Sequence, residues 1–214
     1  MPSHVQSKIV SNAASTTPAL AYTSSVTAGS TLILVINWGD AVTSLTSVAD
    51  SVNPGNWTQA AFVQAQSRTI GIFYKSGALA GVTTVTATLG ASIATVFSLY
   101  EIQGIGALDK ASASGNGVAS TACLSDLIAT IGDGEFVVSG LRGGTVSAGT
   151  PGWTLLNTGG AGSEFIIPGG PPSWYQAAFT AASSVYVSAI ASFLATDNPL
   201  ATMILTPWGL ARVI

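Results

Sequence analysis

The 214-residue chain contains few side chains that could act as nucleophile, acid or base: one histidine, one cysteine and nine carboxylates. A Ser-His-Asp or Cys-His mechanism needs a histidine held in a packed site. The only histidine, His4, lies in an N-terminal stretch rich in Ser, Thr and Ala, which we expect to be a mobile arm. Both hydrolase mechanisms are therefore disfavoured, and one histidine with one cysteine does not supply the usual zinc ligands.

Paired carboxylates could still serve a glycosidase. Most of the nine occupy turn sequences such as Gly-Asp-Gly at 132–134, where aspartate bonds to the turn backbone. Glu101 differs, because it lies in an otherwise apolar stretch. It either pairs with Arg68, Lys75 or Arg142, or marks the point where its strand reaches solvent. The nine are Asp40, Asp50, Glu101, Asp109, Asp126, Asp133, Glu135, Glu164 and Asp197.

No pattern in the sequence supplies a metal or phosphate site. A D-x-D-x-D-G calcium loop does not occur, and the glycines between 159 and 170 do not join a strand to a helix, so we interpret them as a flexible loop. Cys123 has no partner for an intramolecular disulfide and is expected to be a small buried hydrophobe. We therefore predict no catalytic, cofactor-binding or metal-binding residues, no cofactor and no enzyme activity.

The tryptophans leave a carbohydrate-binding role open, because sugar-binding sandwiches stack pyranose rings on exposed indoles. Tryptophan in a sandwich lies more often in the core or at an interface. A glycan site, if present, is expected near Trp174 in the G-G-P-P-S-W-Y loop. The four that we considered are Trp57, Trp153, Trp174 and Trp208.

Charged residues make up only 7% of the chain, against roughly 25% in ordinary soluble domains. Exposed strand edges are usually protected by such charges, so we expect other protein to cover them, in a homo-oligomer or a larger assembly. The alternative is a secreted monomer with Thr-rich faces and short edges. The formal net charge of −3 and the pI near 4.7 give no basic surface for nucleic acid or an anionic membrane.

The N-terminus lacks a basic region followed by an apolar one, so we expect no secretory signal and synthesis in the cytoplasm. The longest uncharged interval, 165–196, contains P-G-G-P-P and many serines, and its second half alternates like a strand. A membrane span is therefore not expected there.

Residues 82–104 predict two consecutive strands joined at 90–92, which we expect to form a central hairpin. In the first, Val85, Ala87 and Leu89 alternate with threonines, as in a strand with one wet face. In the second both faces are largely apolar, as expected for a strand in the middle of a sandwich.

Strand and turn signals recur along the rest of the chain about every 8–12 residues, the spacing of sandwiches and barrels. We predict an all-β fold: a single antiparallel β-sandwich, jelly-roll-like, with extended terminal arms. Residues 1–28 form an N-terminal arm or first edge strand, 29–196 the sandwich, and 197–214 a C-terminal strand or arm. Further strands are predicted at 5–10, 31–38, 45–50, 57–65, 68–75, 108–114, 118–124, 135–141, 153–156, 174–180 and 184–194, with a hairpin turn at 115–117.

These segments, in this order, resemble a jelly-roll-type β-sandwich module of tailed-phage virion proteins and bacterial extracellular proteins. The resemblance implies a non-catalytic role in display, adhesion or particle building. The absence of a leader and of an attached enzyme domain favours the phage setting. The matching pieces are G-S-T-L-I-L-V-I (29–36), L-T-S-V-A-D-S-V-N-P-G-N-W-T (45–58), Y-K-S-G and T-T-V-T-A-T (within 74–88), Y-E-I-Q-G-I and A-L-D (within 100–109), E-F-V-V-S-G-L (135–141) and G-W-T-L-L-N (152–157).

Together these features predict a structural protein of a phage virion, located in the particle after assembly in the host cytoplasm. A capsid decoration (cement) or head-fibre protein is favoured over a tail component. Its expected partners are copies of itself, as a trimer, and the major capsid or other virion proteins. The alternative is a carbohydrate-binding adhesion module of a tail fibre or secreted surface protein.

Overall fold

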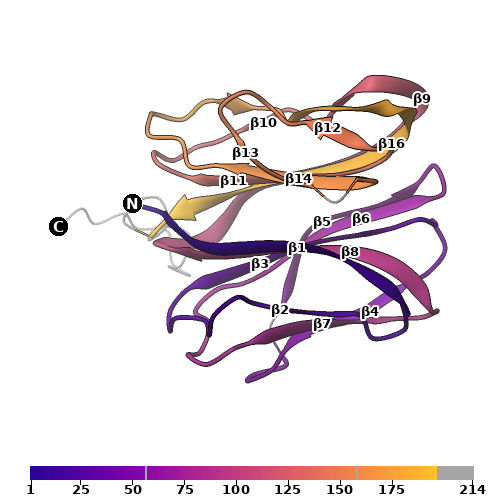
Figure 1. The fold of residues 1–214 in the computed structure, drawn as a ribbon. Helices are drawn as coiled ribbons and strands as arrows, with labels where there is room; N and C mark the ends of the chain where they lie inside the picture. Colours follow the sequence, from indigo (N-terminus) through magenta and orange to yellow (C-terminus); the bar gives the residue numbers. More distant parts are fainter. Residues whose placement is uncertain (56, 158, 197–214) are drawn as a thin grey trace, which may run out of the picture.

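The computed structural model describes residues 1–55, 57–157 and 159–196, which form strands and no helix. Three antiparallel sheets stack in layers (Figure 1), so the predicted all-β, sandwich-like fold is confirmed. The middle sheet has the order β1 (Ser3–Ser15), β8 (Ile93–Gln103), β3 (Thr31–Trp38), β6 (Arg68–Lys75) and β5 (Thr58–Ala65). The lower sheet has the order β2 (Ala19–Ala21), β7 (Thr84–Leu89) and β4 (Leu45–Asp50).

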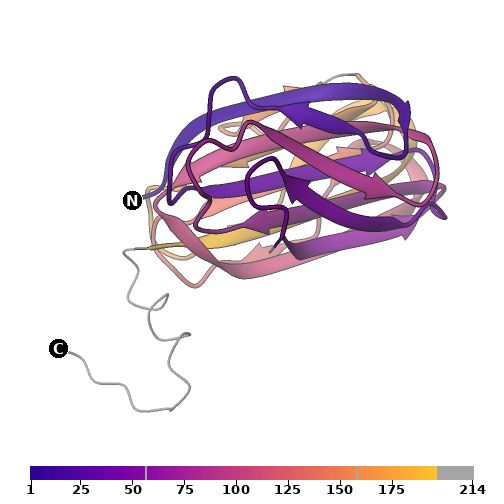
Figure 2. The same ribbon diagram turned by 90° about the horizontal axis from the view of Figure 1, so that it is seen from below.

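The upper sheet is the largest, and a short ribbon packs against it. Its order is β12 (Val146–Ala148), β16 (Ala178–Ala195), β11 (Phe136–Arg142), β14 (Ala161–Ile166) and β13 (Thr154–Asn157), and β9 (Ile105–Leu124) also pairs with β16. The ribbon consists of β10 (Ile128–Ala129) and β15 (Trp174–Tyr175). Seen from below, the strands of the stacked sheets lie along broadly the same axis (Figure 2).

The middle sheet is buried on both faces, which explains the continuous apolar run of β3. All 8 residues of β3 are buried. Leu32 and Leu34 pack toward the lower sheet with Val85, whereas Ile33 and Val35 pack toward the upper sheet. Successive side chains of a strand point to opposite faces, so a strand between two layers needs apolar residues at every position.

The hairpin predicted for residues 82–104 is wrong, although both strands exist. β7 pairs with β2 and β4 in the lower sheet, while β8 pairs with β1 and β3 in the middle sheet. The faces were predicted correctly, since Val85, Ala87 and Leu89 are buried against the middle sheet. The link at 90–92 therefore carries the chain from one layer to the next, which side-chain alternation cannot distinguish from a hairpin.

The hairpin predicted around 115–117 is also wrong, because β9 is one strand of 20 residues that follows β16. The glycines there serve close packing. A Cβ at Gly115 would lie 2.7 Å from the Cβ of Ala65, and one at Gly117 would lie 3.2 Å from Nε2 of Gln66. Glycine within a strand often marks such a close approach, and it is easily mistaken for a turn.

The flexible loop predicted around the glycines from 159 onward is likewise corrected. Ala161–Ile166 forms β14, which pairs with β11 on one side and β13 on the other. The small residues at its start are typical of a loop, yet the first five positions of this strand are buried. The strand predicted at 174–180 divides into β15 and the start of β16, which then continues through 184–194.

The N-terminal stretch forms β1, which is longer than the strand predicted at 5–10. It pairs with β8 from Ser3 to Ser15 as the outer strand of the middle sheet. The C-terminal strand or arm predicted at 197–214 lies outside the described residues.

Gly140 lies at a close approach of the upper and middle sheets, since an added Cβ would be 2.5 Å from Cγ1 of Val35 and 2.9 Å from Cδ1 of Ile70. We expect Gly140→Ala to lower the free energy of unfolding by about 1–3 kcal/mol, because an extra methyl overpacks this layer. Urea denaturation measures the loss. Gly169→Ala is the control, since nothing lies within 4 Å of its Cβ position. Equal midpoints for the two variants would contradict the prediction.

Candidate functional site

His4 does not lie in a mobile arm, which corrects the sequence-based expectation. It is part of β1, opposite Ile102 of β8, and its ring stacks on Phe165 with 4.7 Å between centroids. Partial burial lowers the pKa of its imidazole. The stacking on Phe165 therefore holds the histidine against the upper sheet.

Glu101 is fully buried and pairs with none of the three cations proposed for it, so both sequence-based interpretations are wrong. Its Oε2 accepts a hydrogen bond from Nε2 of Gln6 at 2.6 Å. Its Oε1 accepts from the N–H of Thr27 at 2.8 Å and from Oγ of Ser30 at 2.9 Å. The carboxylate thus fastens the N-terminal strand and the segment before β3 to β8, a structural task.

Asp40 has the turn role that the sequence predicted. Its carboxylate accepts hydrogen bonds from the N–H groups of Val42 and Thr43 and from the Thr43 hydroxyl. Burial alone would raise the pKa of this carboxyl, but these hydrogen bonds hold it below its usual value.

Asp50 combines a turn role with a buried ion pair. It accepts from the N–H groups of Val52 and Asn53 and forms a salt bridge with Lys75, which is only 4% exposed. Burial opposes ionisation, yet the bond from Lys75 and the two N–H groups keep the pKa of Asp50 below its usual value.

Two carboxylates do come together, at Asp109 and Glu135. The N–H of Ile131 donates to both, at 3.1 Å to each carboxylate. The side chain of Asp109 and the whole of Glu135 are each 1% exposed, and Oε2 of Glu135 is buried without a hydrogen-bond partner. A glycosidase must bring its two carboxylates to a substrate, whereas this pair is closed to one.

Two buried glutamates should make the protein more stable on mild acidification. Burial raises the pKa of Glu135 and of Glu164. The folded state then binds these protons more tightly than the unfolded state, so stability rises as the pH falls from neutral toward about 5. At lower pH, stability declines as Asp40 and Asp50, whose pKa values are lowered, become protonated.

Thermal melting across this pH range checks the prediction. Glu135→Gln should stabilise the protein more at pH 7 than at pH 5 and so flatten the profile, because the amide carries no charge. The same carboxyl-to-amide change at the exposed Asp133 serves as the control. A melting temperature that falls steadily as the pH is lowered from neutral would contradict the prediction.

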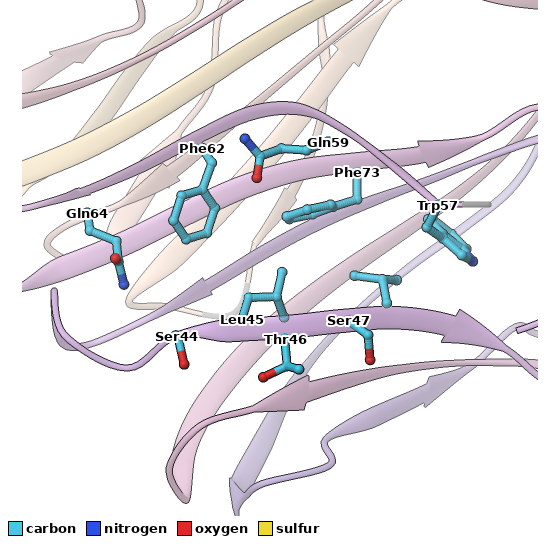
Figure 3. Close-up of a pocket in the computed structure, with 10 residues that line it drawn as sticks. Ser44, Leu45, Thr46, Ser47, Trp57, Gln59, Phe62, Gln64 and Phe73 are labelled. Atoms are coloured by element: carbon cyan, nitrogen blue, oxygen red, sulfur yellow. The ribbon is translucent and has the colours of Figure 1, made fainter. Parts of the chain in front are cut away.

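A groove of about 360 Å³ lies between the lower and middle sheets. In Figure 3 the rings of Phe62 and Phe73 point toward Leu45, whereas Thr46 and Ser47 point to the other side of β4. The groove thus opens between the two sheets, and polar and apolar side chains contribute about equally to its lining. The lining residues are Ser44, Leu45, Thr46, Ser47, Val48, Trp57, Gln59, Phe62, Gln64 and Phe73.

At each end of this groove, a side chain from the β5 side donates a hydrogen bond to a residue on the β4 side. At one end Nε2 of Gln64 donates to the carbonyl oxygen of Thr43 at 2.8 Å. At the other end Nε1 of Trp57 donates to Oδ2 of Asp50 at 3.3 Å. The lining has no charged side chain. The groove therefore fits an uncharged occupant that carries both apolar and polar groups.

The walls of the groove are outer strands of their sheets. β4 pairs only with β7, and β5 only with β6, among the strands described. Register shifts interrupt the pairing of β4 near Leu45 and Ser47, and that of β5 near Gln59 and Ala61. Bulges of this kind hinder continuous edge-to-edge pairing and stand in for the missing surface charges.

The tryptophans divide between the groove and other places. Trp174, the residue favoured for glycan binding, is 66% exposed in β15 and does not line the groove. Trp57 lines the groove, and Trp153 packs on Tyr175 with 6.5 Å between ring centroids. Trp208 lies outside the described residues. One sign of the groove in the sequence is that Trp57 begins the second of two consecutive predicted strands, 45–50 and 57–65, that belong to different sheets.

Comparison with protein-family models, curated proteins and solved structures found no match to this chain. Among the residues described, no group of three or more His, Cys, Asp or Glu side chains is placed to hold a metal ion. That part of the chain also has no helix suited in length and hydropathy to crossing a membrane.

Proposed function

We propose that the protein is a non-enzymatic structural protein of a phage virion, a capsid decoration or head-fibre protein that assembles through strand edges. The observation that carries this proposal is the long outer strand β9, whose only strand partner in the described chain is β16. Val118 and Leu124 of β9 are 71% and 42% exposed. An unpaired edge with exposed apolar side chains favours contact with another protein surface.

The buried acidic groups support a structural rather than a catalytic role. Glu101, Glu135 and Glu164 are each at most 1% exposed. Each accepts hydrogen bonds from main-chain N–H groups, of Thr27, of Gly132 and of Thr150 respectively. Carboxylates used in this way fix loops to strands. The virion setting rests on the sequence resemblance and on the scarcity of charge, which suits a surface covered by other subunits.

Sedimentation velocity and binding to emptied phage capsids test this proposal. We expect an oligomer, a trimer, that cosediments with capsids. Val118→Lys should shift it toward monomer, because a lysine on an outer strand opposes pairing. Thr88→Lys, on the outer face of the inner strand β7, is the matched control. A monomer that ignores capsids would overturn the proposal.

The exposed indole of Trp174 favours one second candidate, a carbohydrate-binding adhesion module. A glycan array decides between the two. Binding that is lost in Trp174→Ala and kept in Trp57→Ala would place the sugar on β15. A blank array together with capsid binding would favour the structural role.

A further inference from the structure

We propose that Lys75 and Asp50 condense into an intramolecular amide bond, which ties β6 of the middle sheet to β4 of the lower sheet. Each of the two residues is the last of its strand. Before condensation they form the buried ion pair described above, and the reaction replaces that pair with a covalent link. The link concerns the chain itself and does not depend on the proposed function.

The two reacting groups are in contact and closed off from water. Nζ of Lys75 lies 2.5 Å from Oδ2 of Asp50, closer than the roughly 2.7–2.9 Å that is usual for an ammonium–carboxylate hydrogen bond. Their side chains are 4% and 0% exposed. Groups held together in this way react as if they were at very high concentration, and bulk water does not compete with the amine for the carboxyl carbon.

The carboxyl oxygen that would carry the developing negative charge already has two donors. Oδ1 of Asp50 accepts hydrogen bonds from the N–H groups of Val52, at 3.1 Å, and Asn53, at 2.8 Å. Paired main-chain N–H groups stabilise the oxyanion of a tetrahedral acyl intermediate in the same way. The turn after β4 therefore supplies a preformed oxyanion site on the carboxyl group that the amine contacts.

Two further contacts orient the amine and the oxygen that would leave. The carbonyl oxygen of Asn53 accepts a hydrogen bond from Nζ of Lys75 at 2.5 Å and so holds one of its N–H groups. Nε1 of Trp57 donates to Oδ2 of Asp50 at 3.3 Å, so this oxygen has a hydrogen-bond donor of its own. Trp57 also lines the groove, which gives the released water an open space beside the reacting pair.

The condensation balances without a further reactant. A proton passes from the ammonium group of Lys75 to Oδ2 of Asp50, and the freed lone pair of Nζ forms a bond to Cγ. Negative charge moves to Oδ1, where the N–H groups of Val52 and Asn53 hold it. A second proton moves from Nζ to Oδ2, the Cγ–Oδ2 bond breaks, and one water molecule leaves. The remaining N–H of the new amide still faces the carbonyl of Asn53.

Burial favours the product but the resting ion pair slows its formation. A buried ion pair carries the desolvation cost of two charges, whereas the amide is neutral. Burial alone would raise the pKa of Asp50, but the hydrogen bonds from Lys75, Asn53 and Val52 lower it. The neutral pair that reacts is therefore a minor state, and we expect the link to form over hours to days.

Mass spectrometry of the denatured full chain tests for the link. After incubation of the folded protein at neutral pH, we expect a mass that is one water molecule below that of the sequence. Trypsin then locates the change, because a linked Lys75 is no longer cleaved, so residues 9–68 should stay joined to residues 69–110. Cleavage after Lys110, whose side chain is 44% exposed in its ion pair with Asp109, is the internal control and should be complete.

Three variants separate the link from other losses of water. Lys75→Arg keeps the positive charge but offers a guanidinium group, which is always protonated, so it should keep its full mass. Asp50→Asn should lose one ammonia molecule instead of one water, because its NH₂ group takes the place of the leaving oxygen. Asp133→Ala removes the one Asp-Gly pair of the sequence, the pair most prone to cyclise onto the main chain, and should still lose water.

A chain of full mass that trypsin cuts freely after Lys75 would overturn the inference and leave the two residues as an ion pair only. A loss of water that persists in Lys75→Arg, or that maps to other peptides, would overturn it as well. If either substituted chain fails to fold, the tryptic map of the natural chain still decides. None of these outcomes depends on the oligomeric state or on capsid binding, so the link and the proposed function fail separately.

Discussion

Replacing Lys75 with methionine is expected to lower the free energy of unfolding by about 3–5 kcal/mol, because it leaves the Asp50 carboxylate buried without its cation. Lys75 is 4% exposed and Asp50 is 6% exposed. The ammonium group also donates to the carbonyl oxygen of Asn53, so the substitution removes a bond from the turn after β4 as well. Urea denaturation followed by tryptophan fluorescence measures the loss, and the signal of Trp57 reports on the groove.

A surface lysine in an ion pair provides the matched control. Lys110 forms a salt bridge with Asp109 at 3.1 Å, but its side chain is 44% exposed. Lys110→Met should lower stability less than Lys75→Met does, because water solvates the half-exposed ammonium group of Lys110 and screens its attraction to Asp109. Adding Asp50→Leu to Lys75→Met should recover part of the loss, since it removes the unpaired buried charge. Equal effects of the two methionine substitutions would contradict the buried ion pair.

Glu101→Gln should lower the free energy of unfolding by about 2–3 kcal/mol, although it only replaces one carboxylate oxygen with an NH₂ group and removes the charge. The two oxygens of Glu101 face donors only: Gln6 on one side, and Thr27 with Ser30 on the other. The amide of Gln6 cannot turn to help, because its oxygen accepts from the N–H groups of Thr23 and Ser24. Either orientation of a glutamine at 101 therefore sets an NH₂ group against a donor.

The loss should appear first in the N-terminal strand. Hydrogen exchange is expected to show faster opening of β1 and of the segment before β3 than of β11 in the upper sheet. Asp133→Asn makes the same change at an exposed position and should have little effect. A Glu101→Gln variant as stable as the natural chain would show that the carboxylate is not held as described.

Several strands could be predicted because their patterns are local. β3 and β6 were predicted with the bounds that the structure has, and β4 likewise. Their limits are set by turn residues such as Gly39 and Pro54, and their faces by the period of two. The buried role of Cys123 and the turn role of Asp40 follow from residue type alone and are confirmed.

The mispredicted strands share one cause. The strands that pair with them are distant in the sequence, so the local residue pattern does not indicate the pairing. The turn-like sequence around Gly115 is held extended by β16, whose pairing with β9 spans both of the strands predicted there. β14 has a sequence of small residues, yet it is central because β11 and β13 flank it. Gly140 and Gly115 are needed for contacts with residues far away in the chain, and nothing near them in sequence indicates this.

The sequence by itself determined that this chain is built of antiparallel strands, which of their faces are apolar, and that charge is scarce, because side-chain alternation and composition act within a few residues. Only the tertiary structure decided which strands share a sheet, that the middle sheet is covered on both sides, and that Glu101 binds main-chain and neutral donors instead of a cation. It also placed Trp57, Phe62 and Leu45 around one groove. These outcomes depend on contacts between segments distant in the chain, and such contacts form only when the sheets stack.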